Sequence, residues 1–356
     1  MTPTPLAERL RERIAREGPI SFADFMRAAL YDPEEGYYQR RSALGEGGDF
    51  VTSPHVSPAF AGAVARMFAL DAMSWEGEVE LVEAAAGSGR FLEDFAGWIA
   101  RLDPGLHGRL RLTAIEEAAA RREELSRRPI LPKPRVLASA SELPEGSVRG
   151  WIFSNELYDA LPTHRVVGSE SGPQELRVGV AGGRFVWVEA AIGDAVARAL
   201  AGAGVSLEPG QRGEVCLEAP ELHGRLARSL SEGRLVAFDY GHPARILYHP
   251  LARPAGTLAV HSLGRRGGDP LDEPGEVDLT AHVNWDALMT AGEAAGLRTD
   301  RLQRQGMVLT EAGVFDFATT DAEKWRIFRL VDPNGMGEEI SALFQSKGMA
   351  GGATAL

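Results

Sequence analysis

The sequence is poor in cysteine, since its 356 residues include only Cys216. One cysteine cannot form an intramolecular disulfide, and it leaves no thiolate cluster for a structural zinc. Apolar runs are also short, and none approaches the roughly 20 residues that a membrane-spanning helix needs. The N-terminus lacks the apolar core of a signal peptide. These absences predict a protein of a reducing compartment, so we expect it in the cytoplasm and without a membrane partner.

Concentrated positive charge is missing as well. The formal net charge is −12, with 38 Lys and Arg against 50 Asp and Glu, whereas phosphate recognition needs a basic surface. The densest basic run, RRPILPKPR at 127–135, contains three prolines, and we interpret it as an extended surface connection. A nucleic-acid partner is therefore not expected.

Several catalytic motifs are absent. No Gly-Lys-Ser/Thr follows the glycines near residue 87, and no Gly-x-Ser-x-Gly nucleophile elbow occurs. Four histidines in the second half lack the close spacing of zinc ligands: His242, His249, His261 and His282. The sequence thus predicts no phosphate-binding P-loop, no serine hydrolase and no metal site.

From residue 79 onward, strand-like and helix-like segments alternate. Strands are expected at 79–85, 109–116, 135–139, 150–155 and 233–242, and helices at 91–102 and 117–128. A helix at 284–296 and a closing pair of strands should follow. This alternation predicts an α/β fold with a parallel sheet and right-handed crossovers.

Two long segments interrupt the alternation. Residues 174–190 carry two β-rich arms around Gly182–Gly183, which is typical of a hairpin, and 243–282 are rich in proline, glycine and charge. We predict an N-terminal helical portion with an active-site loop at 1–75. An α/β domain follows at 76–320, with insertions at about 168–215 and 243–282. A C-terminal helical segment with a flexible tail occupies 321–356.

The segment VEAAAGSGRF at 82–91 has the form strand, acidic residue, glycine turn, helix. Gly87 and Gly89 let the backbone approach a ligand, and the helix N-terminus directs N–H groups at it. Glu116 ends the next strand, where a carboxylate can bind both hydroxyls of a ribose. Methyltransferases and dinucleotide enzymes share this arrangement, although the third glycine of the dinucleotide motif is missing here. A tight packing turn without a ligand is the alternative.

Five motifs follow one another in a fixed order: LGEGGDFVTSPHVS, VEAAAGSGRF, SNELYDALPTHRVV, FDYGH and PGEVDLTAHVNW. Taken together they resemble the MidA family of class I methyltransferases, over roughly residues 20–315. That family includes the mitochondrial complex I assembly factor that acts as a protein arginine methyltransferase. The resemblance implies a Rossmann-like, seven-stranded methyltransferase fold with an N-terminal helical extension and inserted elements, and S-adenosyl-L-methionine as the cofactor.

The resemblance also implies roles for particular residues. The cofactor should lie over Gly87 and Gly89, with Glu83 near its amino acid end and Glu116 at its ribose. Two further residues, from the GDFVTSP loop, should close over the cofactor and the transferred methyl: Asp49 and Thr52. The resemblance places His282 near the acceptor pocket, and His55 stands where the family has a carboxylate near that pocket. Tyr240 is a further candidate for binding the acceptor, because FDYGH ends a strand on the same edge of the sheet.

The stretch WIFSNELYDA places polar side chains directly after an apolar strand. Carboxylates there can bind the N–H fork of a guanidinium and stabilise its charge during methyl transfer. We expect this role for Glu156 and Asp159, with Asn155 orienting the acceptor or the cofactor, and His242 as a candidate base. In the alternative interpretation, Glu156 and Asp159 cap the next helix by binding backbone N–H groups.

Two departures from the family pattern stand out. The family has Glu-Leu-Gly-Pro-Gly-Arg-Gly in the glycine turn, whereas Ala85, Ala86 and Ser88 replace its Gly, Pro and Arg here. His55 stands where the family has a glutamate in its TSPE segment. The first departure bears on cofactor binding and the second on the choice of acceptor.

Three functions agree with these residues. The leading hypothesis is methyl transfer from S-adenosyl-L-methionine to an arginine of a protein partner. An O- or N-methyltransferase acting on a small molecule would use His55 or His242 as a base instead. A non-catalytic assembly factor is the third, and its support is the altered glycine turn. The expected partner is a protein or small-molecule acceptor, and a homodimer is left open.

Overall fold

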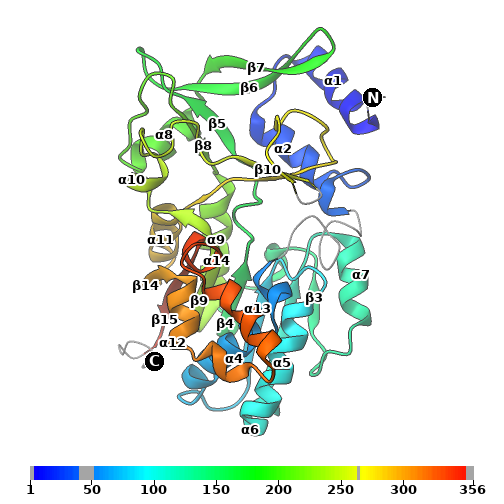
Figure 1. Ribbon diagram of the computed structural model, residues 1–356, viewed down its shortest axis with the longest axis vertical. Helices are drawn as coiled ribbons and strands as arrows, with labels where there is room; N and C mark the ends of the chain where they lie inside the picture. The colour runs from blue at the N-terminus through cyan, green and yellow to red at the C-terminus, as the bar shows by residue number, and fades with distance from the viewer. Residues whose placement is uncertain (1–3, 40–51, 263–264, 350–356) are drawn as a thin grey trace. The chain divides into compact units, whose positions relative to one another are not determined.

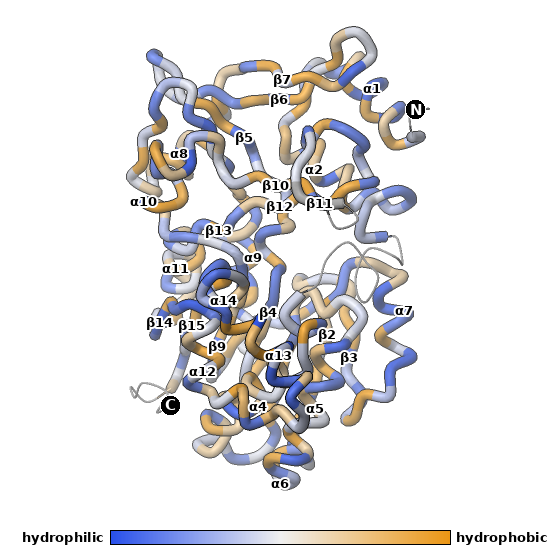
Figure 2. The backbone as a smooth tube through the Cα atoms, viewed as in Figure 1, coloured by the Kyte–Doolittle hydropathy of each residue, from blue (hydrophilic) through white to orange (hydrophobic). Residues whose placement is uncertain are grey.

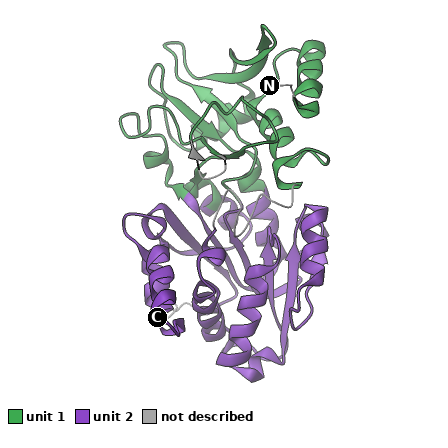
Figure 3. Ribbon diagram, turned by 45° about the vertical axis from the view of Figure 1, so that its right-hand side comes forward, with its two compact units in different colours: residues 1–50, 158–221, 241–288 green, residues 51–157, 222–240, 289–356 purple. Residues whose placement is uncertain are grey.

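A computed structural model describes residues 4–39, 52–262 and 265–349 of the chain (Figure 1). The chain divides into two compact units, coloured separately in Figure 3. Unit 1 comprises residues 1–50, 158–221 and 241–288, and unit 2 comprises 51–157, 222–240 and 289–356. Both predicted insertions belong to unit 1. Each unit is described separately below.

A mixed β-sheet forms the centre of unit 2. Its strands are β1 (Val79–Ala84), β2 (Leu110–Ile115), β3 (Arg135–Leu137), β4 (Val148–Asn155), β9 (Leu230–His242), β14 (Arg298–Arg304) and β15 (Ile340–Lys347). They are ordered β3-β2-β1-β4-β9-β15-β14, and β15 runs antiparallel to both of its neighbours while the other pairs are parallel. The seven-stranded α/β fold implied by the sequence is therefore confirmed.

Helices supply the rest of unit 2. The longer ones are α4 (Ala59–Ala72), α5 (Arg90–Leu102), α7 (Ala119–Arg127), α9 (Glu218–Ser229), α11 (Trp285–Ala294), α12 (Gln305–Glu311) and α13 (Asp321–Val331), and α9 and α11 begin in unit 1. The short ones are α3 (Ser53–Val56), α6 (Pro104–His107), η2 (Ala140–Glu142), η3 (Val314–Phe317) and α14 (Met336–Glu339). α7 is hydrophilic along most of its length (Figure 2).

The sheet is buried on both faces because its strands carry apolar residues at successive positions. In β1, Leu81 packs into one core cluster with α4 and α5, whereas Val82 packs into another with α9. The first cluster is rich in aromatic rings, and the rings of Phe91 and Phe153 stack with their centroids 4.3 Å apart. Buried parallel strands of this kind position the residues that follow them along one edge of the sheet.

A cluster of polar contacts around Arg234 connects four elements of this core: α4, β9, β4 and β14. The Nε of Arg234 in β9 donates to Oδ2 of Asp71 at 2.5 Å, and the indole N–H of Trp151 in β4 donates to the same oxygen at 2.9 Å. A second carboxylate, from Asp300 in β14, also accepts from Arg234. The guanidinium thus neutralises the buried carboxylate of Asp71, as a buried charge requires, and also binds the partly exposed carboxylate of Asp300.

The C-terminal segment differs from the prediction. Residues 321–356 were expected to be helical with a flexible tail, and α13 does begin there with a capping box between Thr320 and Glu323. However, Ile340–Lys347 is β15, a strand inserted between β14 and β9. All but the last of its residues are buried. The segment therefore lacks the clear alternation of apolar and polar residues by which a strand is identified in a sequence.

Unit 1 contains two antiparallel sheets. The first has the order β7-β6-β5-β8 and is built from β5 (His164–Val167), β6 (Gln174–Ala181), β7 (Arg184–Ala191) and β8 (Arg212–Val215). The second, β11-β10-β12, consists of β10 (Ala259–Ser262), β11 (Arg265–Arg266) and β12 (Asp278–Thr280). The predicted hairpin is present as β6 and β7, and its turn residues Gly182 and Gly183 both have positive φ.

The helices of unit 1 are α1 (Pro5–Glu17), α2 (Phe22–Tyr31), η1 (Tyr37–Gln39), α8 (Asp194–Gly202) and α10 (Ala244–Leu247), and β13 (Val283–Asn284) pairs with the last two residues of β9. Ser21 caps α2 as its sequence predicts, because its Oγ accepts the N–H of Asp24 at 3.0 Å. Within the described ranges, no helix combines the length and apolarity needed to cross a membrane.

His223 generates a prediction about pH and stability. Its ring is fully buried on α9, its Nε2 lies 2.8 Å from Oε1 of Gln345, and burial lowers the pKa of His223 to about 4. Between pH 6.5 and 4 the unfolded chain therefore binds a proton at this residue that the folded chain does not. Stability must fall as the pH falls through this window, by about 2 kcal/mol between pH 7 and pH 5.

We expect His223→Gln to reduce this pH dependence, measured as the free energy of unfolding in urea at both pH values. The control is His107→Gln, which changes a histidine that bonds a backbone carbonyl near the surface and should leave the slope unaltered. Equal slopes for the wild type and His223→Gln would contradict the prediction.

Candidate functional site

The carboxyl ends of β1, β2, β4 and β9 lie side by side in the sheet, and the chain after β1 forms the glycine turn. Ala85, Gly87 and Gly89 in this turn have φ values of 59°, 52° and 79°. Three left-handed residues within five reverse the chain tightly between β1 and α5. The N–H of Ala86 donates to the carbonyl of Ile115 at 3.0 Å, which fastens the turn to the end of β2.

The two glycines of the turn are required for different reasons. A Cβ at Gly87 would meet nothing within 4 Å, so only its left-handed backbone favours glycine. A Cβ at Gly89 would lie 2.8 Å from Cγ of Leu125 in α7, which is closer than side chains tolerate. Ala85 occupies a left-handed position without being glycine, at a cost of roughly 1–2 kcal/mol.

Glu116 binds the turn directly. Its Oε2 accepts the N–H of Gly87 and its Oε1 accepts that of Ala118, both at 2.8 Å. Burial raises the pKa of Glu116, and these two N–H donors oppose that rise. The hydrogen bond to Gly87 thus holds the glycine turn and at the same time orients the carboxylate of Glu116 at the end of β2.

Glu83, near the end of β1, is buried close to Glu116. Burial raises the pKa of Glu83 well above its usual range, and the neighbouring Glu116 raises it further. Its Oε2 is buried and has no hydrogen-bond partner among the described residues. A buried acceptor without a donor is costly unless a ligand supplies one. The pair of carboxyl groups therefore suits a ligand that carries positive charge and N–H or O–H donors.

Glu156 follows β4 in a left-handed backbone conformation, with a φ of 51°. Its N–H continues the sheet by donating to the carbonyl of Phe238 at 2.8 Å. Its Oε1 accepts the N–H of Ser53 at 3.2 Å and the side-chain amide of Asn155 at 2.9 Å. Backbone binding was the alternative to a catalytic role, but the helix bound is α3 and not the following one. The two bonds fix the direction of the carboxylate.

The TSPH segment lies against this end of β4. Ser53 is fully buried, and its Oγ donates to Oε1 of Gln305 at 3.0 Å. The side chains of Thr52 and His55 hydrogen-bond at 2.8 Å, Oγ1 to Nδ1. Burial and the nearby arginines, first of all Arg90, lower the pKa of His55. The imidazole is therefore neutral at physiological pH.

The end of β9 contributes Tyr240, whose backbone N–H donates to Oδ1 of Asp239 at 2.8 Å. The other carboxylate oxygen of Asp239 accepts the N–H of Leu157 at 3.1 Å. Asp239 is fully buried and serves to connect the ends of β9 and β4. Tyr240 itself is half-buried at the carboxyl edge of the sheet.

Three of the predicted residues that the structure describes belong to unit 1. The rings of His242 and His282 lie with their centroids 5.4 Å apart, and the N–H of His282 donates to Oγ1 of Thr257 at 3.0 Å. The guanidinium of Arg253 donates to Nε2 of His242. The role of His242 as a base stays a prediction.

Asp159, the third of them, is buried, and its backbone carbonyl accepts the N–H of Ala281 at 2.9 Å. Asp49 lies outside the described residues. Among the residues that the structure describes, no group of three or more His, Cys, Asp and Glu side chains could hold a metal ion.

One functional candidate escaped the sequence analysis. Arg128 belongs to the run that was interpreted as an extended surface connection, yet its Nε donates to the carbonyl of Ser88 at 2.6 Å. This contact places a guanidinium against the glycine turn, 40 residues away in sequence. Only its position at the end of the helix before Pro129 could have drawn attention to it.

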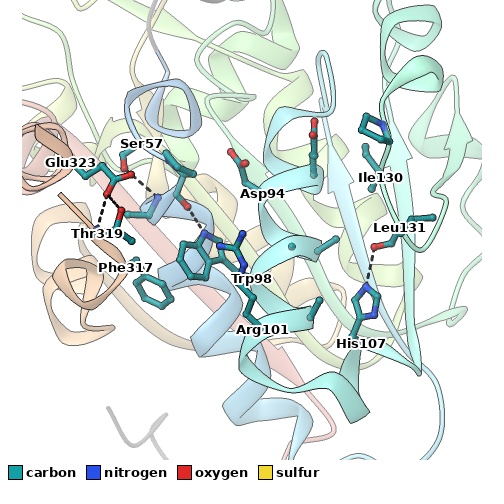
Figure 4. Close-up of a pocket in the computed structure, with 17 residues that line it drawn as sticks. Ser57, Asp94, Trp98, Arg101, His107, Ile130, Leu131, Phe317, Thr319 and Glu323 are labelled. Carbon is teal, nitrogen blue, oxygen red and sulfur yellow. Dashed lines mark hydrogen bonds between the residues drawn. The ribbon is translucent and has the colours of Figure 1, made fainter.

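A cavity of about 730 Å³ lies along α5 (Figure 4). Trp98 lines it. The centroid of its ring lies 4.8 Å from that of Phe317, and its indole N–H donates to the carbonyl of Pro58 at 3.0 Å. None of the residues predicted from the sequence to act in catalysis or binding lines this cavity. The carboxyl edge of the sheet therefore remains the candidate site.

Comparison with known proteins identifies the family of the chain. Residues 63–303 match a family described as "Putative S-adenosyl-L-methionine-dependent methyltransferase". The chain is 30% identical to a Burkholderia thailandensis protein described as a "likely methyl transferase" and solved with bound S-adenosyl-homocysteine; the match has a TM-score of 0.88 and covers 100% of this chain and 97% of the other. A second crystal structure from that organism matches with a TM-score of 0.86 at 28% identity, over the same shares of the two chains.

Curated relatives are more distant. The mitochondrial protein arginine methyltransferase NDUFAF7 of Bos taurus is 27% identical over 334 residues, which cover 83% of this chain and 71% of that protein. The Danio rerio protein of the same name is 28% identical over 315 residues, 80% of this chain and 71% of the relative.

The backbone strain at Ala85 generates a second prediction. Ala85→Gly should raise the free energy of unfolding by about 0.5–1 kcal/mol, because glycine adopts a left-handed φ without a steric penalty. Gly89→Ala should lower it by about 1–3 kcal/mol, because the new methyl meets Leu125. Both values can be measured by urea unfolding.

Gly97→Ala is the matched control. Gly97 lies within α5, and a Cβ there would meet nothing within 4 Å, so this variant should be stabilised by helix propensity alone. A loss of stability in Ala85→Gly, or an unchanged Gly89→Ala, would contradict the assignment of strain and packing in this turn.

Proposed function

We propose an acceptor and a site for this chain, which belongs to the family of S-adenosyl-L-methionine-dependent methyltransferases matched above. The enzyme transfers a methyl group from that cofactor, and we place the cofactor over the glycine turn of unit 2. The proposed acceptor is an arginine side chain of a protein partner. The observation that supports an arginine acceptor is the carboxylate of Glu156, which two hydrogen bonds fix in direction at the end of β4.

The residues around the glycine turn fit the cofactor. Gly87 leaves the backbone of the turn open to close approach, Gly89 packs against Leu125 of α7, and Glu83 offers a buried acceptor that needs a donor. Glu116 is the candidate for the ribose hydroxyls, and Thr52 lies on the segment joined to Glu156 through Ser53. When bound, the cofactor supplies a methyl group on a cationic sulfur. Two carboxyl groups with raised pKa values favour such a cation, because it stabilises their ionised forms.

The proposed acceptor role of Glu156 follows from the chemistry of a guanidinium. Its nitrogens are poor nucleophiles while the positive charge is delocalised, so a fixed carboxylate must orient one nitrogen and stabilise the charge as the bond forms. A residue other than glycine with a left-handed φ costs roughly 1–3 kcal/mol, and such strain clusters at functional sites. The names of the curated relatives also favour an arginine acceptor.

His55 supports a second candidate. Its neutral imidazole is suited to accept a proton from a hydroxyl or amine, which a small-molecule acceptor would require. Asp159, Tyr240 and His282 remain candidates for binding either acceptor, and Asp49 for closing over the cofactor. We keep the cytoplasm as the proposed location.

The test incubates the purified protein with methyl-labelled cofactor and a lysate of its own organism that lacks the gene. Label in a protein band, traced to methylarginine, would support the proposal. Label confined to small molecules would favour the second candidate. No label together with no cofactor binding would favour the non-catalytic assembly factor.

Glu116→Gln should weaken binding of S-adenosyl-homocysteine by at least roughly 10-fold, because the amide cannot accept at both oxygens. The control Glu117→Gln changes an exposed neighbour and should bind as the wild type does. Isothermal titration calorimetry gives both dissociation constants. Equal affinities for the two variants would remove Glu116 from the cofactor site.

Glu156→Gln should lower kcat for an arginine acceptor by roughly 100-fold while leaving cofactor affinity within about 3-fold, because it removes charge stabilisation that acts only during transfer. His55→Gln should then reduce kcat much less. The reverse order, with His55→Gln inactive and Glu156→Gln active, would refute the arginine grip and support a hydroxyl or amine acceptor.

A further inference from the structure

Arg128 follows the last residue of α7 and reaches back to the glycine turn. Its Nε donates to the backbone carbonyl of Ser88 at 2.6 Å, and its Nη1 donates to Oε2 of Glu93 on α5, also at 2.6 Å. Its Nη2 lies 3.4 Å from Oγ of Ser88. The side chain is 26% exposed. One guanidinium therefore binds the turn and the helix that begins after it.

The carbonyl that Arg128 holds is the central one of the turn. Ser88 stands between Gly87 and Gly89, and both glycines have left-handed backbones that the unfolded chain populates together with many others. On one side of the turn, Glu116 accepts the N–H of Gly87. On the other side, Arg128 donates to the carbonyl of the next residue. The backbone of Gly87 and Ser88 is thus held by a carboxylate on one side and by a guanidinium on the other.

The shape of the guanidinium matters here. Its rigid planar fork donates to the Ser88 carbonyl and the Glu93 carboxylate in fixed relative directions, which a flexible lysine ammonium does not reproduce. Glu93 also neutralises the charge of Arg128, so the arginine can stand beside a site for a cation. Arg90 at the start of α5 is paired in the same manner with Asp94 at 2.8 Å.

We propose that Arg128 is a positioning residue for the cofactor: its guanidinium fixes the Ser88 carbonyl and thereby the glycine turn in the conformation that receives S-adenosyl-L-methionine. This inference rests on the proposed placement of the cofactor over Gly87 and Gly89. The residue touches neither the reacting atoms nor the acceptor, so its effect falls on cofactor affinity. The acceptor KM should be unaffected.

The test measures binding of S-adenosyl-homocysteine by isothermal titration calorimetry. Arg128→Ala should bind roughly 10–30-fold more weakly than the wild type, because a hydrogen bond from a charged group to a structured carbonyl is lost. Arg128→Lys should bind more weakly by at least about 5-fold and guards against a folding defect in the alanine variant. Thermal unfolding of each variant identifies losses that arise only from instability.

Two controls separate the carbonyl contact from general charge effects. Arg127→Ala removes the exposed neighbour, whose described partner is Glu123 on its own helix, and should bind within about 3-fold of the wild type. Glu93→Gln keeps an acceptor for Arg128 but removes the neutralising charge, so it should weaken binding by less than Arg128→Ala does. If Glu93→Gln weakens binding as much as Arg128→Ala, the ion pair and not the turn contact is responsible, and the inference is overturned.

The proposed cofactor site and the role of Arg128 can fail separately. A wild-type protein that does not bind S-adenosyl-homocysteine would refute the site and the inference with it. If the wild type binds and Glu116→Gln does not, whereas Arg128→Ala binds as the wild type does, the site stands and the role of Arg128 is refuted.

Discussion

The hydrogen bond from Gly87 to Glu116 is the constraint on which the candidate site depends. It joins the turn after β1 to the end of β2, and it places a buried carboxylate beside Glu83. Burial raises the pKa of both carboxyl groups and so disfavours their ionised forms. Both are held there by the parallel register of β1 and β2, which aligns Glu83 with Ala114 and Ala84 with Ile115. The geometry of the sheet thus brings together two carboxyl groups whose ionised forms a positively charged ligand would stabilise.

Backbone strain marks the ends of two adjacent strands. Ala85 follows β1 and Glu156 follows β4, and both have left-handed φ without being glycine. Backbone hydrogen bonds to the sheet offset the energy of this strain: the N–H of Ala86 donates to the end of β2, and the N–H of Glu156 donates to β9. The two positions differ in chemistry. Glycine at 85 would relieve the strain, whereas glycine at 156 would remove a carboxylate.

The sequence predicted those features that depend on local patterns. Alternating apolar segments revealed the α/β fold, and the glycine spacing located the turn, since both signals lie within a few residues of each other. β15 was missed because a strand buried throughout shows no alternation. Contacts between distant residues were also beyond reach, such as Ser53 with Glu156 and Arg253 with His242. No pattern in the sequence relates side chains that meet only after the chain has folded.

The electrostatics of the site bear on how the proposed reaction ends. Transfer from the sulfonium to a guanidinium converts two cations into one cation, a neutral thioether and a released proton. Under the proposed function, Glu83 and Glu116 would help to hold the cofactor, which would supply a methyl group on a cationic sulfur. Burial raises the pKa values of both carboxyl groups, so they would hold a cationic cofactor more tightly than an uncharged one. A buried acidic pair would therefore favour the reactive cofactor over its product, provided that the glycine turn keeps its shape while the charge changes.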